Sequence, residues 1–93
     1  MTAVARRLTI HGRVQGVFYR KWAVQTATML ELTGWVRNRA NGCVEALVEG
    51  PADRVERFIA LARQGPAAAK VSRIDIIDCA PPGPSSFDKR PTV

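Results

Sequence analysis

Residues 34–51, GWVRNRANGCVEALVEGP, contain two strand patterns on either side of a turn. The Asn41-Gly42 pair suits the positive φ angles of a tight hairpin turn. Gly34 opens the first strand, which covers residues 35–39. The returning strand alternates between two sides, with Val44, Ala46 and Val48 on one and Glu45, Leu47 and Glu49 on the other. This stretch therefore predicts a β-hairpin in the middle of the chain.

A helical pattern lies on each side of the hairpin. Apolar residues recur at helical spacing between about Arg20 and Leu30, which predicts an amphipathic helix. After the hairpin, Pro51 can occupy the first turn of a second helix, where its missing N–H costs nothing. The Gly65-Pro66 pair ends that helix. Its expected buried stripe consists of Val55, Phe58, Ile59 and Ala62.

Strand patterns occupy both ends of the chain. Residues 5–11 alternate, with Leu8 and Ile10 on one side, and Gly12 is expected to end this strand. Residues 71–78 predict a further strand, with Ile74 and Ile76 on one face. The segment 80–86 is rich in Pro, Gly and Ser and predicts a loop, followed by a short last strand within residues 87–93.

The order β-α-β-β-α-β, with a short extra C-terminal strand, is the ferredoxin-like plan of the α+β class. It places two helices on one face of a mostly antiparallel sheet. Its first crossover joins parallel strands, with the third strand between them. One domain is expected to span residues 1–93, because a chain of 93 residues has room for a single core. The fold alone does not name a function.

The chain is basic, with 14 Lys and Arg residues against 8 Asp and Glu residues and a net charge of +6. This balance favours an anionic ligand, which leaves nucleic acid, an anionic membrane and phosphorylated metabolites open. The arginines are scattered, which favours a solvated basic surface over a nucleic-acid stripe. The sequence has neither the apolar stretch of a signal peptide nor a run near the roughly 20 apolar residues of a membrane span. We therefore expect a cytoplasmic monomer without a membrane partner.

The two cysteines, Cys43 and Cys79, lie far apart and have no CxxC or Cys/His companion in the sequence. Neither a zinc site nor a redox pair is predicted. Both thiols are expected to be reduced in that compartment, and a disulfide is the less favoured alternative.

A loop that suits an anion joins the first strand to the first helix. It is GRVQGVFYR, residues 12–20. Gly12 and Gly16 permit left-handed backbone angles, so that successive N–H groups can turn inward near a helix N-terminus. Arg20 stands at the helix start, where its fork of donors can close over phosphate oxygens. A plain strand-to-helix turn with a solvated Arg20 fits this segment equally well.

Asn38 is the second candidate, because asparagine is a poor strand former and yet lies late in a strand. It can instead simply end the strand before the hairpin. If the first two strands are parallel, the loop after one and the carboxyl end of the other lie at the same edge of the sheet. Arg20 and Asn38 would then share one pocket.

GRVQGVFYR at 12–20 and GWVRNRANGCVE at 34–45 resemble the two motifs of the acylphosphatase family, in the family's order and separation. The resemblance extends over nearly the whole chain, including the Gly-Pro pairs at 50–51 and 65–66 and the terminal FDKRPT at 87–92. It implies the ferredoxin-like fold and hydrolysis of a small-molecule acyl phosphate. Glu31 departs from the family pattern, which often has glycine after the first helix, and would be strained in a left-handed backbone.

The resemblance also implies roles for individual residues. Arg20 would bind the phosphate and Asn38 would orient the attacking water. No metal and no cofactor are implied. The backbone amides of five residues would form the phosphate cradle: Gln15, Gly16, Val17, Phe18 and Tyr19.

The side-chain inventory suits this chemistry. An acyl phosphate releases a carboxylate, whose conjugate acid has a pKa of roughly 4, so no acid catalyst is needed. The lone histidine, His11, is assigned a surface or packing role. Tyr19 borders the loop and its role is left open. Four aromatic residues follow core periodicities: Phe18, Trp22, Trp35 and Phe58.

Two other functions compete with this one. An RNA-binding module can share the fold, but its central strands carry stacking aromatics, whereas residues 6–12 and 43–50 have none. Glu45 and Glu49 would also repel RNA phosphates. A non-catalytic phosphate- or carbamoyl-phosphate-sensing domain is the second alternative, which the free-standing length disfavours.

Overall fold

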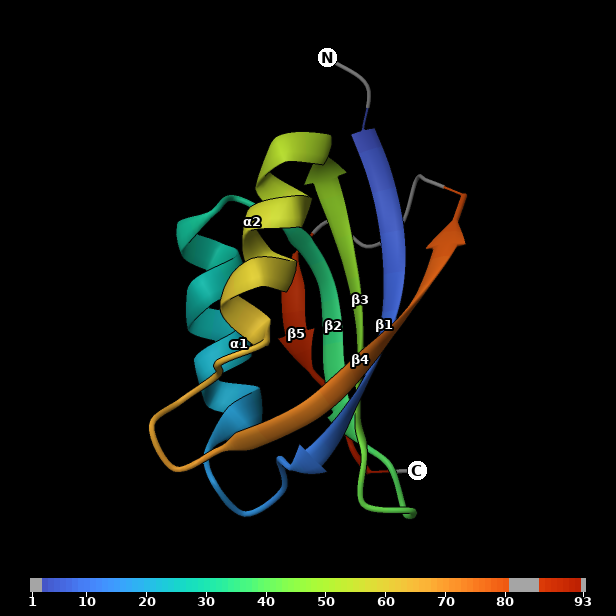
Figure 1. The fold of residues 1–93 in the computed structure, drawn as a ribbon. Helices are drawn as coiled ribbons and strands as arrows, with labels where there is room; N and C mark the ends of the chain where they lie inside the picture. The colour runs from blue at the N-terminus through green and yellow to red at the C-terminus, as the bar shows by residue number, and fades with distance from the viewer. Residues whose placement is uncertain (1–2, 81–85, 93) are drawn as a thin grey trace.

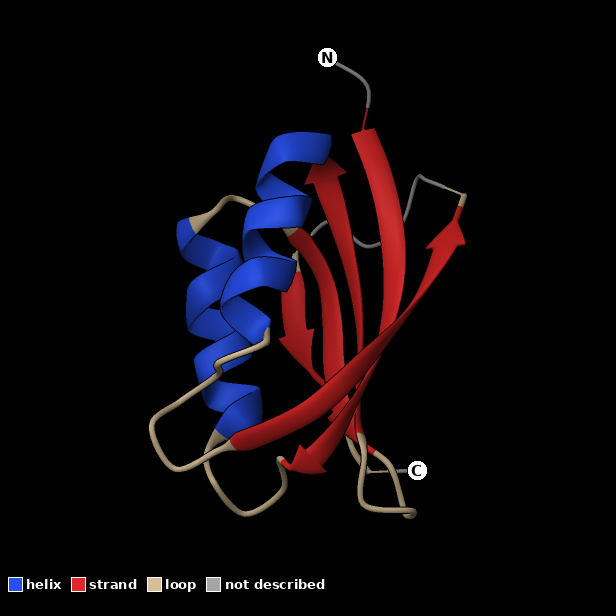
Figure 2. Ribbon diagram, in the orientation of Figure 1, coloured by secondary structure: helices blue, strands red, loops and turns tan. Residues whose placement is uncertain are grey.

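A computed structural model describes residues 3–80 and 86–92 (Figure 1). Two helices lie on one face of a five-stranded sheet, and the opposite face carries no helix (Figure 2). The ferredoxin-like prediction is confirmed. In chain order the elements are β1 (Ala3–Arg13), α1 (Tyr19–Met29), β2 (Thr33–Asn38), β3 (Val44–Pro51), α2 (Ala52–Ala62), β4 (Lys70–Cys79) and β5 (Phe87–Lys89).

The strand order in the sheet is β4-β1-β3-β2-β5. Both β1 and β2 pair antiparallel with β3, so β1 and β2 run in the same direction on either side of it. The short strand β5 pairs parallel with β2. The carboxyl ends of β1, β2 and β5 therefore meet at one edge of the sheet, at the bottom of Figure 1.

The main core fills the space between the helices and the sheet. The apolar side of β3 is fully buried there, and so are Leu8 and Ile10 of β1. The predicted stripe of α2 is buried as well. Ile76 lies on the same face as Ile74 but is 42% exposed, because β4 is an edge strand that the helices do not cover.

The first strand is longer than its sequence predicted. Gly12 was expected to end β1, but the strand continues to Arg13 through a register shift between His11 and Gly12. This is a β-bulge, and Gly12 has a φ of 124° there. A Cβ atom at this position would collide with the carbonyl oxygen of Lys70, so the bulge requires glycine.

Two turn predictions were wrong in detail. In the β2–β3 turn only Gly42 has a positive φ, whereas Asn41 instead accepts a hydrogen bond from the Cys43 N–H at 3.1 Å through its side-chain oxygen. Pro51 is the last residue of β3 and directly precedes α2, so it lies outside the first helical turn. The predicted loop over 80–86 falls mainly on residues 81–85, outside the described residues.

The four aromatic residues expected in the core divide into three groups. Phe58 is fully buried and Trp22 is half-buried against the core, as expected. Trp35 is buried on the other face of the sheet, beneath the guanidinium group of Arg37 at 4.7 Å from the ring centroid. Phe18 is 78% exposed, and the prediction of a core role for it was wrong.

Candidate active site

A hollow of about 420 Å³ lies where the β1–α1 loop meets the carboxyl ends of β2 and β5. Arg20 and Asn38 both line it, as the parallel arrangement of β1 and β2 predicted. Three residues of the predicted cradle also line it, while Gln15 and Val17 do not. The complete lining is Val14, Gly16, Phe18, Tyr19, Arg20, Lys21, Asn38 and Lys89.

The loop backbone has the alternating handedness of an anion-binding nest. Gly16 has a φ of 73° and Phe18 a φ of 64°, and the residue between them has no positive φ. Such alternation turns successive N–H groups toward one side. Open space surrounds the position of a Cβ atom on Gly16, so the backbone angle alone favours glycine there.

The N-terminus of α1 opens toward this loop without neutralisation from the chain itself. Phe18 occupies the N-cap position, and no side chain caps the helix. The first turn contains no acidic residue. The N–H groups and the positive end of the helix dipole are therefore left for an external anion.

The side chains of Arg20 and Asn38 make no hydrogen bond or ion pair with any other described residue. Several other arginines are paired; Arg37, for example, contacts Glu45 at 2.8 Å. A guanidinium and a carboxamide that are both unpaired and face one hollow are available to a ligand. Together with the nest they can bind a phosphate group and place a water molecule beside it.

Gln15 supports the loop from outside the hollow. Its side-chain amide donates hydrogen bonds to the carbonyl oxygens of Arg39 at 2.7 Å and Cys43 at 2.8 Å. These two acceptors flank the β2–β3 turn. The bonds therefore tie the phosphate-loop candidate to the strand end that carries Asn38.

Tyr19 has a structural role that its sequence position left open. Its ring lines the hollow, but its hydroxyl donates a 2.6 Å hydrogen bond to the carbonyl oxygen of Ala62 at the end of α2. Burial raises the pKa of the Tyr19 phenol above its ordinary value. The phenol stays protonated and holds the start of α1 against α2.

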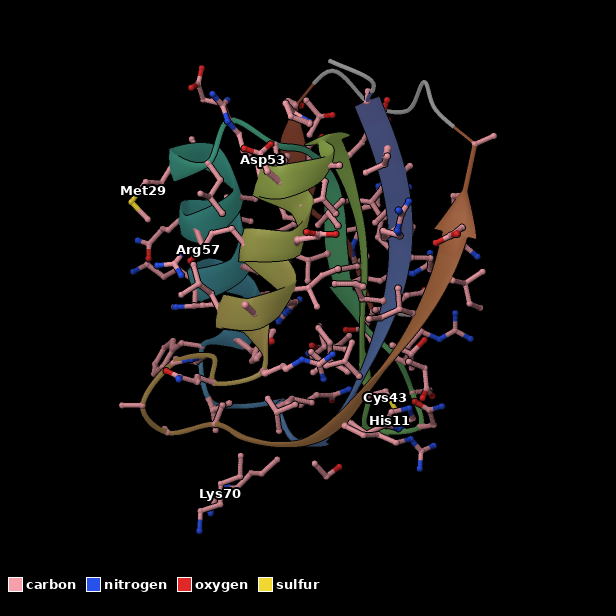
Figure 3. All side chains as sticks on the ribbon, turned by 45° about the horizontal axis from the view of Figure 1, so that its top comes forward. His11, Met29, Cys43, Asp53, Arg57 and Lys70 are labelled. Atoms are coloured by element: carbon pink, nitrogen blue, oxygen red, sulfur yellow. The ribbon has the colours of Figure 1, made fainter. Side chains whose placement is uncertain are left out.

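The side chains usually used for other hydrolytic chemistry lie elsewhere. His11 is on the face of the sheet opposite the helices, 2.9 Å from Asp75 and 3.2 Å from the Cys43 sulfur (Figure 3). The sequence gave no sign of this Cys/His contact, because the residues are 32 positions apart. Cys43 and Cys79 are both free thiols. Among the described residues there is no group of three or more potential metal ligands, and no helix could span a membrane.

Sequence reasoning missed Val14, Lys21 and Lys89 as lining residues. Val14 and Lys21 flank the predicted motif, so proximity alone was a usable indication. Lys89 enters the hollow because β5 pairs parallel with β2, which places Lys89 opposite Val36. A three-residue strand gives no sequence signal for its partner or its direction.

Comparisons with known proteins all point to one family. A family model described as Acylphosphatase matches residues 6–89. A curated relative from Azoarcus sp. (strain BH72), named Acylphosphatase, is 59% identical over 91 residues, which cover 98% of this chain and 93% of the relative.

Solved structures agree with this result. The structure of an acylphosphatase from Coxiella burnetii is 33% identical, with a TM-score of 0.91 over 95% of this chain and 93% of that one. The acylphosphatase from Bacillus subtilis is also 33% identical, with a TM-score of 0.91 over 94% of this chain and 98% of that one.

Proposed function

The chain belongs to the acylphosphatase family and is a hydrolase, and we propose that it hydrolyses the carboxyl–phosphate bond of acyl phosphates in the hollow between Arg20 and Asn38. The products are a carboxylate and inorganic phosphate. The observation that carries the proposal is the convergence of Arg20 and Asn38, without partners among the described residues, on a hollow bordered by an anion-binding loop.

Phosphate binding is assigned to the β1–α1 loop and Arg20. Backbone N–H groups of residues 15–19 surround the phosphate oxygens, and the α1 dipole adds positive potential. The guanidinium of Arg20 donates two parallel hydrogen bonds to the equatorial oxygens. Because charge on these oxygens changes during phosphoryl transfer, donors already in position stabilise the transition state.

Water placement is assigned to Asn38. Its carboxamide can hold a water molecule in line with the bond from phosphorus to the leaving oxygen. The leaving group is a carboxylate, which departs without protonation because its conjugate acid has a pKa of roughly 4. A phosphate oxygen of the substrate accepts the proton of the attacking water. The scheme uses no metal and no cofactor, and a single chain supplies every residue in it, so we propose that the monomer is the active form.

Hydrolysis of benzoyl phosphate, followed by ultraviolet absorbance with a chelator present, tests the proposal. Asn38→Ala should lower kcat by about 100- to 1,000-fold, as does loss of one preorganised donor elsewhere. The matched control is Gln64→Ala, which removes an exposed amide outside the hollow and should keep the parent's rate. A folded parent that binds phosphate but hydrolyses no acyl phosphate would contradict the proposal and favour a phosphate-sensing module.

A further inference from the structure

A second, smaller hollow of about 250 Å³ adjoins the candidate active site. Lys21, Val24 and Gln25 form one wall, since positions i, i+3 and i+4 share one face of a helix. Lys89 of β5 forms the other wall. Lys21 and Lys89 line both hollows, so the two spaces are continuous between this pair of lysines.

The charge along this channel is entirely positive. Arg20, Lys21 and Lys89 line it, and no acidic residue is among the lining residues of either hollow. Neither lysine forms an ion pair with a described residue, whereas Arg6, Arg54 and Arg73 each pair with a nearby carboxylate. The phosphate cradle and Arg20 already provide for one phosphate group. The two ammonium groups are therefore available to a second anion.

The acyl group of a bound substrate needs a route away from the cradle, and the smaller hollow provides one. Residue 25 lies about 7 Å beyond residue 20 along a helix axis, at 1.5 Å per residue. A short acyl chain or an aromatic ring fits that distance. Val24 offers an apolar wall for the carbon skeleton, and the lysines lie on both sides of its path.

We propose that the smaller hollow binds the acyl part of the substrate, and that Lys21 and Lys89 select acyl phosphates whose acyl group ends in a second anionic group. This inference rests on the proposed function, because it places the scissile phosphate between Arg20 and Asn38. The second anion is a carboxylate or a phosphate, since two ammonium groups without a fixed fork recognise charge rather than shape.

Two matched substrates isolate this charge effect. 4-Carboxybenzoyl phosphate carries the second anion at the far end of the ring, and 4-carbamoylbenzoyl phosphate is its neutral isostere. The readout is the ratio of their kcat/KM values in each variant. The intrinsic difference in reactivity between the two substrates is the same for every variant and cancels when ratios are compared.

Lys21→Gln and Lys89→Gln should each lower the ratio by about two- to fivefold, the usual range for one solvent-exposed charge pair. The change should appear mainly as a higher KM for the carboxylate substrate. The double variant should lose roughly the product of the two factors. Lys89→Glu should lower the ratio further than Lys89→Gln, and added salt should reduce the parent's preference.

Arg73→Gln is the matched control, because it removes one positive charge from β4, on the opposite face of the sheet, and should leave the ratio unchanged. If the lysine variants keep the parent's ratio while benzoyl phosphate is still hydrolysed, the inference is wrong and the proposed function stands. If Arg73→Gln lowers the ratio as much as the lysine variants do, net charge is responsible and the inference is also wrong. Failure to hydrolyse any acyl phosphate would contradict the proposed function itself.

Discussion

Glu31 has a left-handed backbone, with a φ of 58°, at the position after α1 where glycine is usual. The Leu32 N–H donates to the Ala27 carbonyl at 2.8 Å and the Glu31 N–H to the Thr28 carbonyl at 3.0 Å. These two bonds form a Schellman motif, which fixes the left-handed residue. The strain inferred from the sequence at Glu31 therefore has a structural basis.

Glu31→Gly should raise the free energy of unfolding by about 0.5–1 kcal/mol, since relief of the left-handed strain exceeds the extra chain entropy of glycine. The lost ion pair between Glu31 and Arg54 spans 3.1 Å at an exposed site and contributes little. Urea denaturation measures the change, with Glu31→Gln as the control that removes only the charge. A glycine variant no more stable than the glutamine variant would refute the strain at this residue.

Arg20 is expected to act through the shape of its side chain as well as its charge. Arg20→Lys keeps the charge but loses the planar fork that matches two phosphate oxygens. We predict that kcat/KM for benzoyl phosphate falls nearly as far in Arg20→Lys as in Arg20→Ala. Full activity in the lysine variant would show that a point charge is sufficient.

Phe18 shows the limit of residue-level prediction. An aromatic residue among apolar neighbours suggests burial, but the left-handed conformation of Phe18 turns its side chain toward solvent at the rim of the hollow. No sequence pattern identifies a left-handed phenylalanine, because the conformation is imposed by the loop around it.

Strand β3 was predicted with the correct faces, but the environment of one face differed from a plain solvated surface. Glu45 and Glu49 lie opposite the helices as the alternation required, and yet they are only 7% and 8% exposed. Glu45 accepts hydrogen bonds from Arg37 at 2.8 Å and Arg39 at 3.2 Å, both through Oε1. Alternation identifies the two faces of a strand, but the long side chains of neighbouring elements decide how much of each face they cover.

This cluster of Glu45, Arg37 and Arg39 should make stability depend on pH in acid. Burial raises the pKa of the Glu45 carboxyl, but hydrogen bonds and charge from both arginines outweigh it and hold that pKa below its ordinary value. A lowered folded-state pKa stabilises the protein above the unfolded-state pKa of about 4.3. That contribution is lost as the pH falls through the folded-state value.

Glu45→Gln should therefore be less stable than the parent at neutral pH, and the difference should shrink as the pH falls below about 4. Urea denaturation of both proteins across this pH range measures it. Asp53→Asn is the control, since Asp53 is exposed and outside the cluster. An equal difference between parent and Glu45→Gln at every pH would show that the glutamate contributes through packing and not through its charge.

Across the whole molecule, the arrangement of strands was the most predictable feature. Hydrophobic periodicity and turn residues gave the order of elements, and the right-handed crossover placed β1 and β2 parallel with β3 between them. That single relation brings Arg20 and Asn38 to one edge of the sheet.

Contacts between distant segments were not predictable in the same way. Gln15 binds the β2–β3 turn, Tyr19 binds the end of α2, and Lys89 reaches the hollow through β5. Each contact depends on side-chain packing between segments more than 20 residues apart, for which one sequence carries no local pattern. The roles of the site residues thus follow from topology and the family motif, whereas the support around them becomes visible only in three dimensions.

The central claim is that the molecule brings water to phosphorus while the loop and Arg20 hold the phosphate. Hydrolysis of benzoyl phosphate in water enriched in oxygen-18, with the label located by mass spectrometry in both products, tests this most directly. The account predicts that the parent enzyme places the label in phosphate and none in benzoate, and that Asn38→Ala slows this labelled release. Label in benzoate would show that water attacks the carbonyl carbon, and would contradict the assigned roles of Arg20 and Asn38.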